Sequence, residues 1–162
     1  MKIKREELQA ACHLVSPGTN TSETLEQSNC FVFDEGYIIA FNDELCMKKK
    51  LDLDFTCAVN AVDFKKLLDK MTDEELDVSF TGDEMIIKGK RKSAGLTVEK
   101  DILLPYKEIP KPTKMAPVDG NLLHWAASAG RVCGVDHTNP KTTHVHVTPE
   151  FVEATEGYRL VR

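Results

Sequence analysis

The sequence lacks the features of membrane-spanning and secreted proteins. No stretch approaches the roughly 18 consecutive apolar residues that a transmembrane helix requires, so we expect no membrane partner. The start, Met1–Glu7, is basic but has no apolar core behind it, so we expect no secretory signal. Five cysteines are an odd number, and none forms a Cys-x-x-Cys pair. Free thiols in a reducing, cytoplasmic setting fit this pattern better than a disulfide framework.

The common catalytic motifs are also missing. No Gly-x-Ser-x-Gly, P-loop or dinucleotide-binding glycine pattern occurs. One enzyme-like arrangement remains: His144 and His146 on one face of a predicted strand, with Asp136 and His137 nearby, could ligate zinc. No glutamate stands beside either strand histidine as a general base, however. We therefore predict no catalytic residues, no metal and no cofactor, and keep a zinc hydrolase as the alternative.

Acidic side chains outnumber basic ones, 26 to 21, giving a formal net charge of −5. This balance disfavours nucleic-acid binding over the whole surface but permits a basic surface on one face. With 162 residues, 41% of them hydrophobic and 29% charged, the chain has the composition and size of one or two globular domains.

Proline is concentrated in one segment. Four of the seven prolines lie within residues 105–117, where the missing amide donors exclude a helix interior or a central strand. We predict a linker that starts at about residue 105. It separates a complete first domain, residues 1–113, from the beginning of a second, residues 114–162.

Two kinds of periodicity alternate before the linker. Apolar residues recur at helical spacing in residues 6–15 and 62–71, with Asn60 as the expected N-cap of the second helix. Apolar runs and alternation predict strands at residues 2–4, 30–33, 37–41, 76–80, 85–88, 96–99 and 102–104. Two amphipathic helices packed on one face of largely antiparallel sheets define the α+β class.

The sequence contains an internal repeat at an offset of 114 residues. Residues 8–15 align with 122–129, and residues 31–47 align with 145–161, both without gaps. Apolar positions coincide through the helix and the hairpin. The second domain is therefore predicted to begin as the first does and to be a duplicated domain of which only the first part is present.

Four stretches resemble the bacterial sliding clamp family, the beta subunit of DNA polymerase III. Residues 1–15 resemble the start of that family, residues 28–43 its first hairpin, and residues 64–87 its second half-domain. The most specific match is Ala154–Leu160, Ala-Thr-Glu-Gly-Tyr-Arg-Leu. It is similar to the family's Ala-Thr-Asp-Gly-His/Tyr-Arg-Leu signature. The resemblance covers nearly the whole chain.

The resemblance implies a DNA clamp fold of repeated domains and a non-catalytic function. Two such chains would form a ring-shaped homodimer that encircles duplex DNA without reading its sequence. The ring would act as a processivity factor, binding DNA polymerase and clamp loader subunits through short linear peptides. Because the chain supplies one domain and part of another, the alternative is a truncated clamp-like module or decoy, of prophage or plasmid type, that binds clamp partners.

Candidate DNA-binding residues are cations on the predicted inner face. Lys65, Lys66 and Lys70 lie on the polar side of the second helix, where they would attract phosphates without sequence readout. Arg131 and His137 occupy the corresponding region of the second domain. An ordinary solvated helix face is the alternative. The basic run 88–92 is expected to be a hairpin tip.

The resemblance also implies a peptide-binding cleft. Carried over from the family signature, its near wall would consist of Thr155, Gly157, Tyr158, Arg159 and Leu160. The alternative for this segment is an ordinary turn between two strands.

Overall fold

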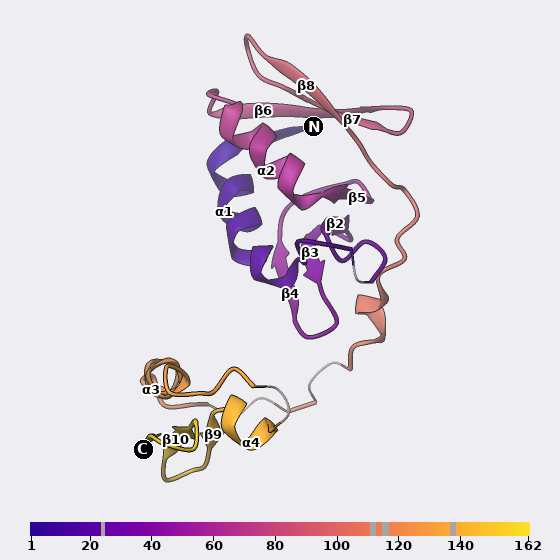
Figure 1. The fold of residues 1–162 in the computed structure, drawn as a ribbon. Coiled ribbons are helices and arrows are strands. Elements are labelled where there is room, and N and C mark those ends of the chain that lie inside the picture. The colour runs from indigo at the N-terminus through magenta and orange to yellow at the C-terminus, as the bar shows by residue number, and fades with distance from the viewer. Residues whose placement is uncertain (24, 111–112, 115–116, 137–138) are drawn as a thin grey trace. The chain divides into compact units, whose positions relative to one another are not determined.

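The structure is a computed structural model that describes the chain except residues 24, 111–112, 115–116 and 137–138. It divides into two compact units, Met1–Pro110 and Lys111–Arg162, which are described separately below. Figure 1 shows the order of the elements along the chain.

Unit 1 consists of two consecutive β-α-β-β-β segments. The first contains β1 (Lys2–Lys4), α1 (Arg5–Val15), the short 3-10 turn η1 (Ser16–Gly18), β2 (Cys30–Asp34), β3 (Tyr37–Phe41) and β4 (Cys46–Lys50). The second contains β5 (Cys57–Asn60), α2 (Ala61–Lys70), β6 (Glu75–Thr81), β7 (Glu84–Lys88) and β8 (Ser93–Thr97). A further 3-10 turn, η2 (Pro105–Glu108), follows.

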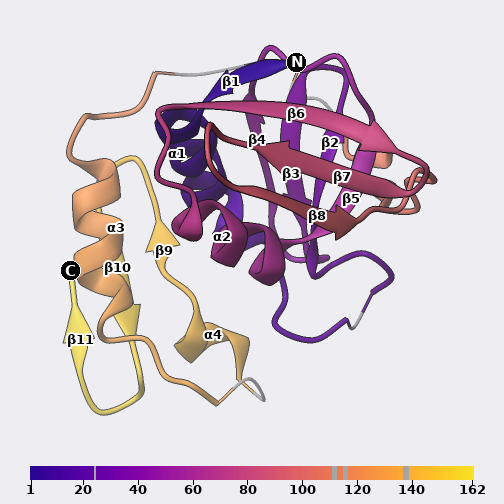
Figure 2. The same cartoon turned by 90° about the horizontal axis from the view of Figure 1, so that it is seen from above.

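The two segments exchange their first strands. The strand orders are β4-β3-β2-β5 and β1-β6-β7-β8, and all pairs between these strands are antiparallel. Ile3 of β1 therefore lies opposite Leu76 of β6, and Phe31 of β2 lies opposite Val59 of β5. Figure 2 shows β6, β7 and β8 side by side with α1 and α2 next to them. This exchange ties both halves of unit 1 into one fold.

The main core lies where the helices meet the sheets. The helical stripe of α1 is buried, as is the stripe of α2. Phe64 of α2 packs against Phe31 and Phe33 of β2, with ring centroids 6.3 and 5.5 Å apart. Asn60 caps α2 as predicted, because its side chain accepts hydrogen bonds from the amides of Val62 and Asp63.

A second apolar cluster covers the opposite face of β2 and β3. It contains Cys30, Val32, Ile39, Phe41, Ala58, Leu104 and Tyr106. The strand predicted at residues 102–104 is wrong: the segment joins no sheet but lies across this face. Its apolar side chains pack onto the sheet, and the backbone amide of Leu103 donates a hydrogen bond to the side-chain oxygen of Gln27 instead of to a neighbouring strand. The cover continues into η2, so the first residues of the proline-rich segment pack onto unit 1.

Two buried polar groups hold this cover in place. Gln27 is fully buried, and its Nε2 donates to Glu99 Oε2 at 2.6 Å and to the Asp101 carbonyl at 2.7 Å. Asp34, only 7% exposed, accepts hydrogen bonds from the Tyr106 hydroxyl and from Thr56 Oγ1, and forms an ion pair with Lys107 at 2.8 Å.

Burial lowers the reactivity of three cysteines of unit 1. Cys12, Cys30 and Cys57 are buried free thiols, and desolvation raises the pKa of each to about 12. Loss of water around the sulfur disfavours the thiolate, so these side chains behave as small apolar groups.

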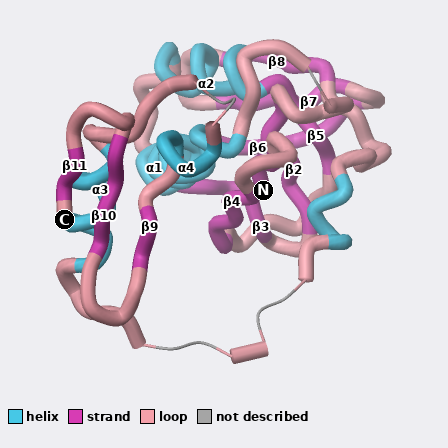
Figure 3. The backbone as a smooth tube through the Cα atoms, turned by 60° about the horizontal axis from the view of Figure 1, so that its bottom comes forward, coloured by secondary structure: helices cyan, strands magenta, loops and turns pink. Residues whose placement is uncertain are grey.

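Unit 2 repeats the start of unit 1. It contains α3 (Leu122–Gly130), the single turn α4 (Pro140–Thr143), β9 (His146–Val147), β10 (Val152–Thr155) and β11 (Leu160–Val161). The three strands form an antiparallel sheet in the order β11-β10-β9, which Figure 3 shows with α3 beside it.

The repeat extends to the pairing register. In unit 1, Val32 pairs with Ile39 and Phe41 with Cys46. The residues 114 positions later form the same pairs: His146 with Glu153, and Thr155 with Leu160. A cation–ring contact is repeated too, with Lys48 over Tyr37 and Arg162 over Phe151, each 4.0 Å from the ring centroid. Because a slip by one residue would reverse every side chain, the agreement supports a structural duplication.

Candidate functional site

Unit 2 carries a pocket of about 380 Å³ beside its sheet. Residues from α4, β9, β10, β11 and the segment that enters β9 line it: Pro140, Lys141, His144, Val145, His146, Glu153, Ala154, Thr155 and Leu160. The apolar members provide a surface for an aliphatic side chain, and the polar members supply donors and acceptors around it. This combination is typical of a site that binds and orients a ligand.

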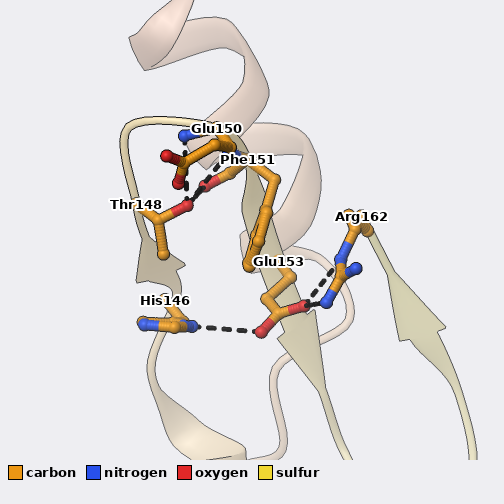
Figure 4. Close-up of polar contacts among 6 residues, drawn as sticks. All are labelled: His146, Thr148, Glu150, Phe151, Glu153 and Arg162. Carbon is orange, nitrogen blue, oxygen red and sulfur yellow. Dashed lines mark hydrogen bonds and ion pairs between the residues drawn. The ribbon is translucent and has the colours of Figure 1, made fainter.

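Glu153 of β10 bonds to His146 on β9 and to Arg162, the residue that follows β11. Its Oε1 lies 3.0 Å from His146 Nδ1 on β9, and its Oε2 accepts hydrogen bonds from Arg162 Nε and Nη2 at 2.9 and 2.7 Å (Figure 4). These bonds, first that to His146 and then those to Arg162, lower the pKa of Glu153. The carboxylate is therefore ionised and compensated on both oxygens at neutral pH.

The prediction that His144 and His146 share a strand is wrong, because His144 is the C-cap of α4 and only His146 lies on β9. Both histidines use the same ring nitrogen. His144 Nδ1 lies 2.8 Å from the carbonyl oxygen of Pro140, which can only accept. His146 Nδ1 faces the Glu153 carboxylate. Each Nδ1 therefore carries the hydrogen in the neutral ring, which leaves Nε2 as an acceptor, or as a donor once the ring is protonated.

The signature segment forms a tight turn between β10 and β11. The amide of Glu156 donates to the Arg159 carbonyl at 3.3 Å, and Thr155 Oγ1 accepts from the Gly157 amide at 3.0 Å. Gly157 has a φ of 99°, a left-handed conformation that favours glycine. Arg159 pairs with Glu156, and Tyr158 is 98% exposed.

The residues expected to form the cleft therefore divide into two groups. Thr155 and Leu160 line the pocket, whereas Gly157, Tyr158 and Arg159 shape the turn next to it. The sequence prediction did not include Pro140, Lys141 and Glu153, and considered His144 and His146 only as zinc ligands. In the part of the chain that the structure describes, no group of three or more His, Cys, Asp or Glu side chains is placed to hold a metal ion.

The lysines expected to contact DNA have different surroundings on α2. Lys65 is half-buried, and its Nζ donates to Ser16 Oγ at 3.1 Å. Lys66 lies 3.8 Å from Asp63 in an exposed ion pair, while Lys70 is exposed at the helix end. In unit 2, Arg131 is the exposed C-cap of α3, and His137 lies outside the described residues.

The basic run 88–92 forms the tip between β7 and β8, and the tip contacts the end of α2. Lys92 Nζ donates to the carbonyl of Lys70 at 2.8 Å, and the amide of Lys90 donates to Asp73 Oδ2 at 3.0 Å. A cation at a helix C-terminus offsets the negative end of the helix dipole. Lys92 therefore has a structural role as well as a charge.

Comparison with solved structures identifies this arrangement of strand-exchanged sheets and a repeated helix and hairpin. The beta subunit of DNA polymerase from Streptococcus pyogenes matches 98% of this chain with a TM-score of 0.75 at 12% identity. The Pseudomonas aeruginosa sliding clamp bound to griselimycin matches 99% (TM-score 0.72, 16% identity), and the Thermotoga maritima beta subunit 98% (TM-score 0.70, 18% identity). The chain has the sliding-clamp fold.

The chain spans 47% of the length of each of these three clamps. No protein-family model and no curated protein sequence matches it. The likeness to sliding clamps is therefore one of structure, maintained at low sequence identity. In the described part of the chain, no helix is both long and apolar enough to cross a membrane.

Proposed function

We propose that this protein is a sliding clamp component, a cytoplasmic processivity factor that encircles duplex DNA and tethers a replicative polymerase without catalysing a reaction. The observation that supports this most is the clamp fold followed by a second domain start in the same register. A ring built from repeated domains needs such a duplication. Two chains in their full-length form would close the ring as a homodimer.

The proposed DNA contacts are non-specific. Lys65, Lys66 and Lys70 on α2, and Arg131 and His137 in unit 2, would attract phosphates across a solvated gap. Lysine charges that neutralise phosphates release counterions, so affinity should fall steeply with salt and show no sequence preference. Since Lys65 and Lys66 already have partners within α1–η1 and α2, we expect weak attraction, which suits a protein that slides.

The proposed partner site is the pocket of unit 2 together with its neighbouring turn. Thr155 and Leu160 would contact a short linear peptide of a DNA polymerase or clamp loader subunit, with Gly157, Tyr158 and Arg159 at its edge. The related Pseudomonas aeruginosa clamp has been solved with griselimycin bound, which supports a small-ligand site on this fold.

Retention on circular DNA tests the proposal. The intact protein, loaded onto a nicked circular plasmid, should remain bound on gel filtration and should be released when the plasmid is linearised, because only a ring is topologically linked to DNA. Release at the same rate from both forms would contradict encirclement and favour the truncated module or decoy that binds clamp partners.

Charge reversal tests the DNA face. Changing Lys65, Lys66 and Lys70 to Glu should weaken binding to a labelled duplex and reduce its salt dependence. The matched control reverses three exposed lysines of β4, Lys48–Lys50, and has the same net charge. Equal losses in both variants would show that overall charge, and not the α2 face, governs binding.

A further inference from the structure

We propose that one side of α3 is an interaction surface for a second copy of this 162-residue chain, with the two α3 helices packed antiparallel about a two-fold axis. The inference goes beyond the proposed function, because it uses neither the pocket of unit 2, nor the DNA contacts, nor the closure of a ring. Three observations support it: the composition of α3, the way in which unit 1 covers the equivalent helix, and the sizes of the side chains that would meet.

Helix α3 differs from α1 and α2 in having no charged side chain. Its sequence is Leu-Leu-His-Trp-Ala-Ala-Ser-Ala-Gly, whereas α1 and α2 each carry several acidic and basic residues. A helix that is apolar on nearly every side is typical of a buried helix. Leu123 is nevertheless 79% exposed, and Ala127 and Gly130, which follow it at helical spacing on the same side, are exposed too. This side of α3 therefore has the composition of a covered surface.

Unit 1 shows what covers this side of the equivalent helix. There α1 lies beside α2 (Figure 2), and two side-chain hydrogen bonds join the helices: Gln9 Nε2 donates to Asp69 Oδ1 at 3.3 Å, and Lys65 Nζ donates to Ser16 Oγ at 3.1 Å. The earlier residue of the first segment contacts the later residue of α2, and the later contacts the earlier. The two helices therefore run antiparallel.

This helix pair is close to two-fold symmetric, because both segments of unit 1 have the same order of elements. Helix α1 begins at residue 5 and α2 at residue 61, an offset of 56 residues. Asp69 thus corresponds to residue 13, and Lys65 corresponds to residue 9. Two identical segments can form the same pair about a true two-fold axis, with each copy contributing the same patch. The symmetry within unit 1 therefore favours a second α3 as the occupant.

The same pairing places a large side chain of α3 against small ones. At the repeat offset of 114 residues, residues 9, 13 and 16 correspond to Leu123, Ala127 and Gly130. Leu123 of one copy would then lie against Ala127 and Gly130 of the other, and the reverse contact would form across the axis. Large side chains opposite small ones allow facing elements to interdigitate. Apolar packing would replace the polar bonds that join α1 and α2.

The sheet of unit 2 extends this surface. In unit 1, Phe64 of α2 packs against Phe33 of β2, with ring centroids 5.5 Å apart. At the two offsets, Phe64 corresponds to Leu122 and Phe33 to Val147, which is 49% exposed. Leu122 of one copy would therefore contact Val147 of the other. The proposed contact buries apolar side chains of both the helix and the sheet.

Sedimentation of the intact protein over a wide range of concentrations tests the inference, with a reversible monomer–dimer equilibrium as the expected result. Leu123→Glu should raise the dissociation constant about a hundredfold, because each copy loses the burial of one leucine. Val135→Glu is the matched control, since Val135 is 90% exposed in the same unit but lies outside α3. It should change the dissociation constant by less than about twofold. Unchanged circular dichroism and Trp125 fluorescence will verify that the variants remain folded.

A second charge tests the antiparallel pairing. Adding Ala127→Lys to Leu123→Glu would place the new ammonium group of one copy beside the new carboxylate of the other, at two symmetric positions. This double variant should recover about tenfold of the lost affinity, and the recovery should decrease with salt. Its control combines Leu123→Glu with Val135→Lys, which has the same net charge, and should recover none.

Each outcome supports or overturns a stated part of the inference. A monomer at every concentration overturns the second copy as the occupant. A dimer that Leu123→Glu leaves unchanged, or that Val135→Glu weakens equally, overturns the assignment to α3. Equal affinities of the two double variants overturn the antiparallel pairing. The circular-DNA experiment decides encirclement separately from all of these results.

Discussion

Removing the hydroxyl of Tyr106 tests how residues 102–106, the cover segment over the outer face of β2 and β3, are held on unit 1. This hydroxyl donates to Asp34 Oδ2 in a buried site, and Lys107 and Thr56 bind the same carboxylate. Burial raises the pKa of Asp34, but the hydrogen bonds from Lys107, Tyr106 and Thr56 outweigh it, so the pKa lies below its usual value. Burial and the same bond to Asp34 raise the pKa of Tyr106 to about 12. The pair therefore consists of a carboxylate and a neutral phenol at neutral pH.

Tyr106→Phe keeps the ring and removes this one bond. A hydrogen bond to a charged group contributes about 1.5–3 kcal/mol, and we expect the free energy of unfolding of unit 1 to fall by that amount at neutral pH. Because the folded pKa of Asp34 is lowered, the ionised carboxylate stabilises the fold above its unfolded pKa, and this contribution is lost as the pH falls through the folded pKa. The difference between Tyr106→Phe and the unaltered protein should therefore shrink in acid.

Urea denaturation followed by circular dichroism measures this loss, and hydrogen exchange of β2 and β3 locates it in unit 1. Fluorescence of the single tryptophan is unsuitable, because Trp125 lies in unit 2. Tyr158→Phe is the matched control, since Tyr158 is 98% exposed and should change stability by less than about 0.5 kcal/mol. A Tyr106→Phe protein as stable as this control at neutral pH, or a loss that does not depend on pH, would refute the reasoning.

Two further predictions use matched positions. Phe33→Ala should lower the free energy of unfolding by about 3–5 kcal/mol, because the ring is fully buried against Phe64. Its repeat counterpart Val147 is 49% exposed, so Val147→Ala should lower it by less than about 1 kcal/mol. Equal losses of the two variants in thermal denaturation would contradict this contrast. Gly18→Ala should destabilise unit 1 by about 1–3 kcal/mol, since a Cβ there would lie 2.8 Å from the Ala40 carbonyl oxygen. Gly120→Ala is the control, because a Cβ at residue 120 would meet no atom within 4 Å. A Gly18→Ala protein as stable as this control in urea denaturation would show that the contact relaxes.

Sequence periodicity predicted the elements that have one buried face. The stripe of α1 and the alternation of β6 were evident because burial on one side leaves a pattern. Strand β4 was missed: its Lys48–Lys50 segment is exposed at a sheet edge, where backbone pairing with β3 maintains the strand without an apolar pattern. Residues 102–104 look like a strand because they are apolar, but they are buried by covering a sheet and not by joining one.

The candidate site was harder to predict than the fold. The offset of 114 residues was visible in apolar positions, and four stretches carried the clamp resemblance, of which Ala154–Leu160 was the most specific. The pocket itself depends on Lys141 and Glu153, which a search for catalytic or family motifs passes over because their types are common. The available signal was the replacement of apolar residues by polar ones between the repeats, as at Val32 and His146.

The buried thiols of unit 1 provide a means of timing its opening. Since the thiolate is the reactive form, Cys12, Cys30 and Cys57 will resist alkylating reagents while their pKa stays at about 12, and each will react when its own part of unit 1 opens. Cys30 lies beneath the cover segment, and Cys12 and Cys57 lie in the main core. Modification of Cys30 before the other two would reveal that the cover detaches ahead of global unfolding.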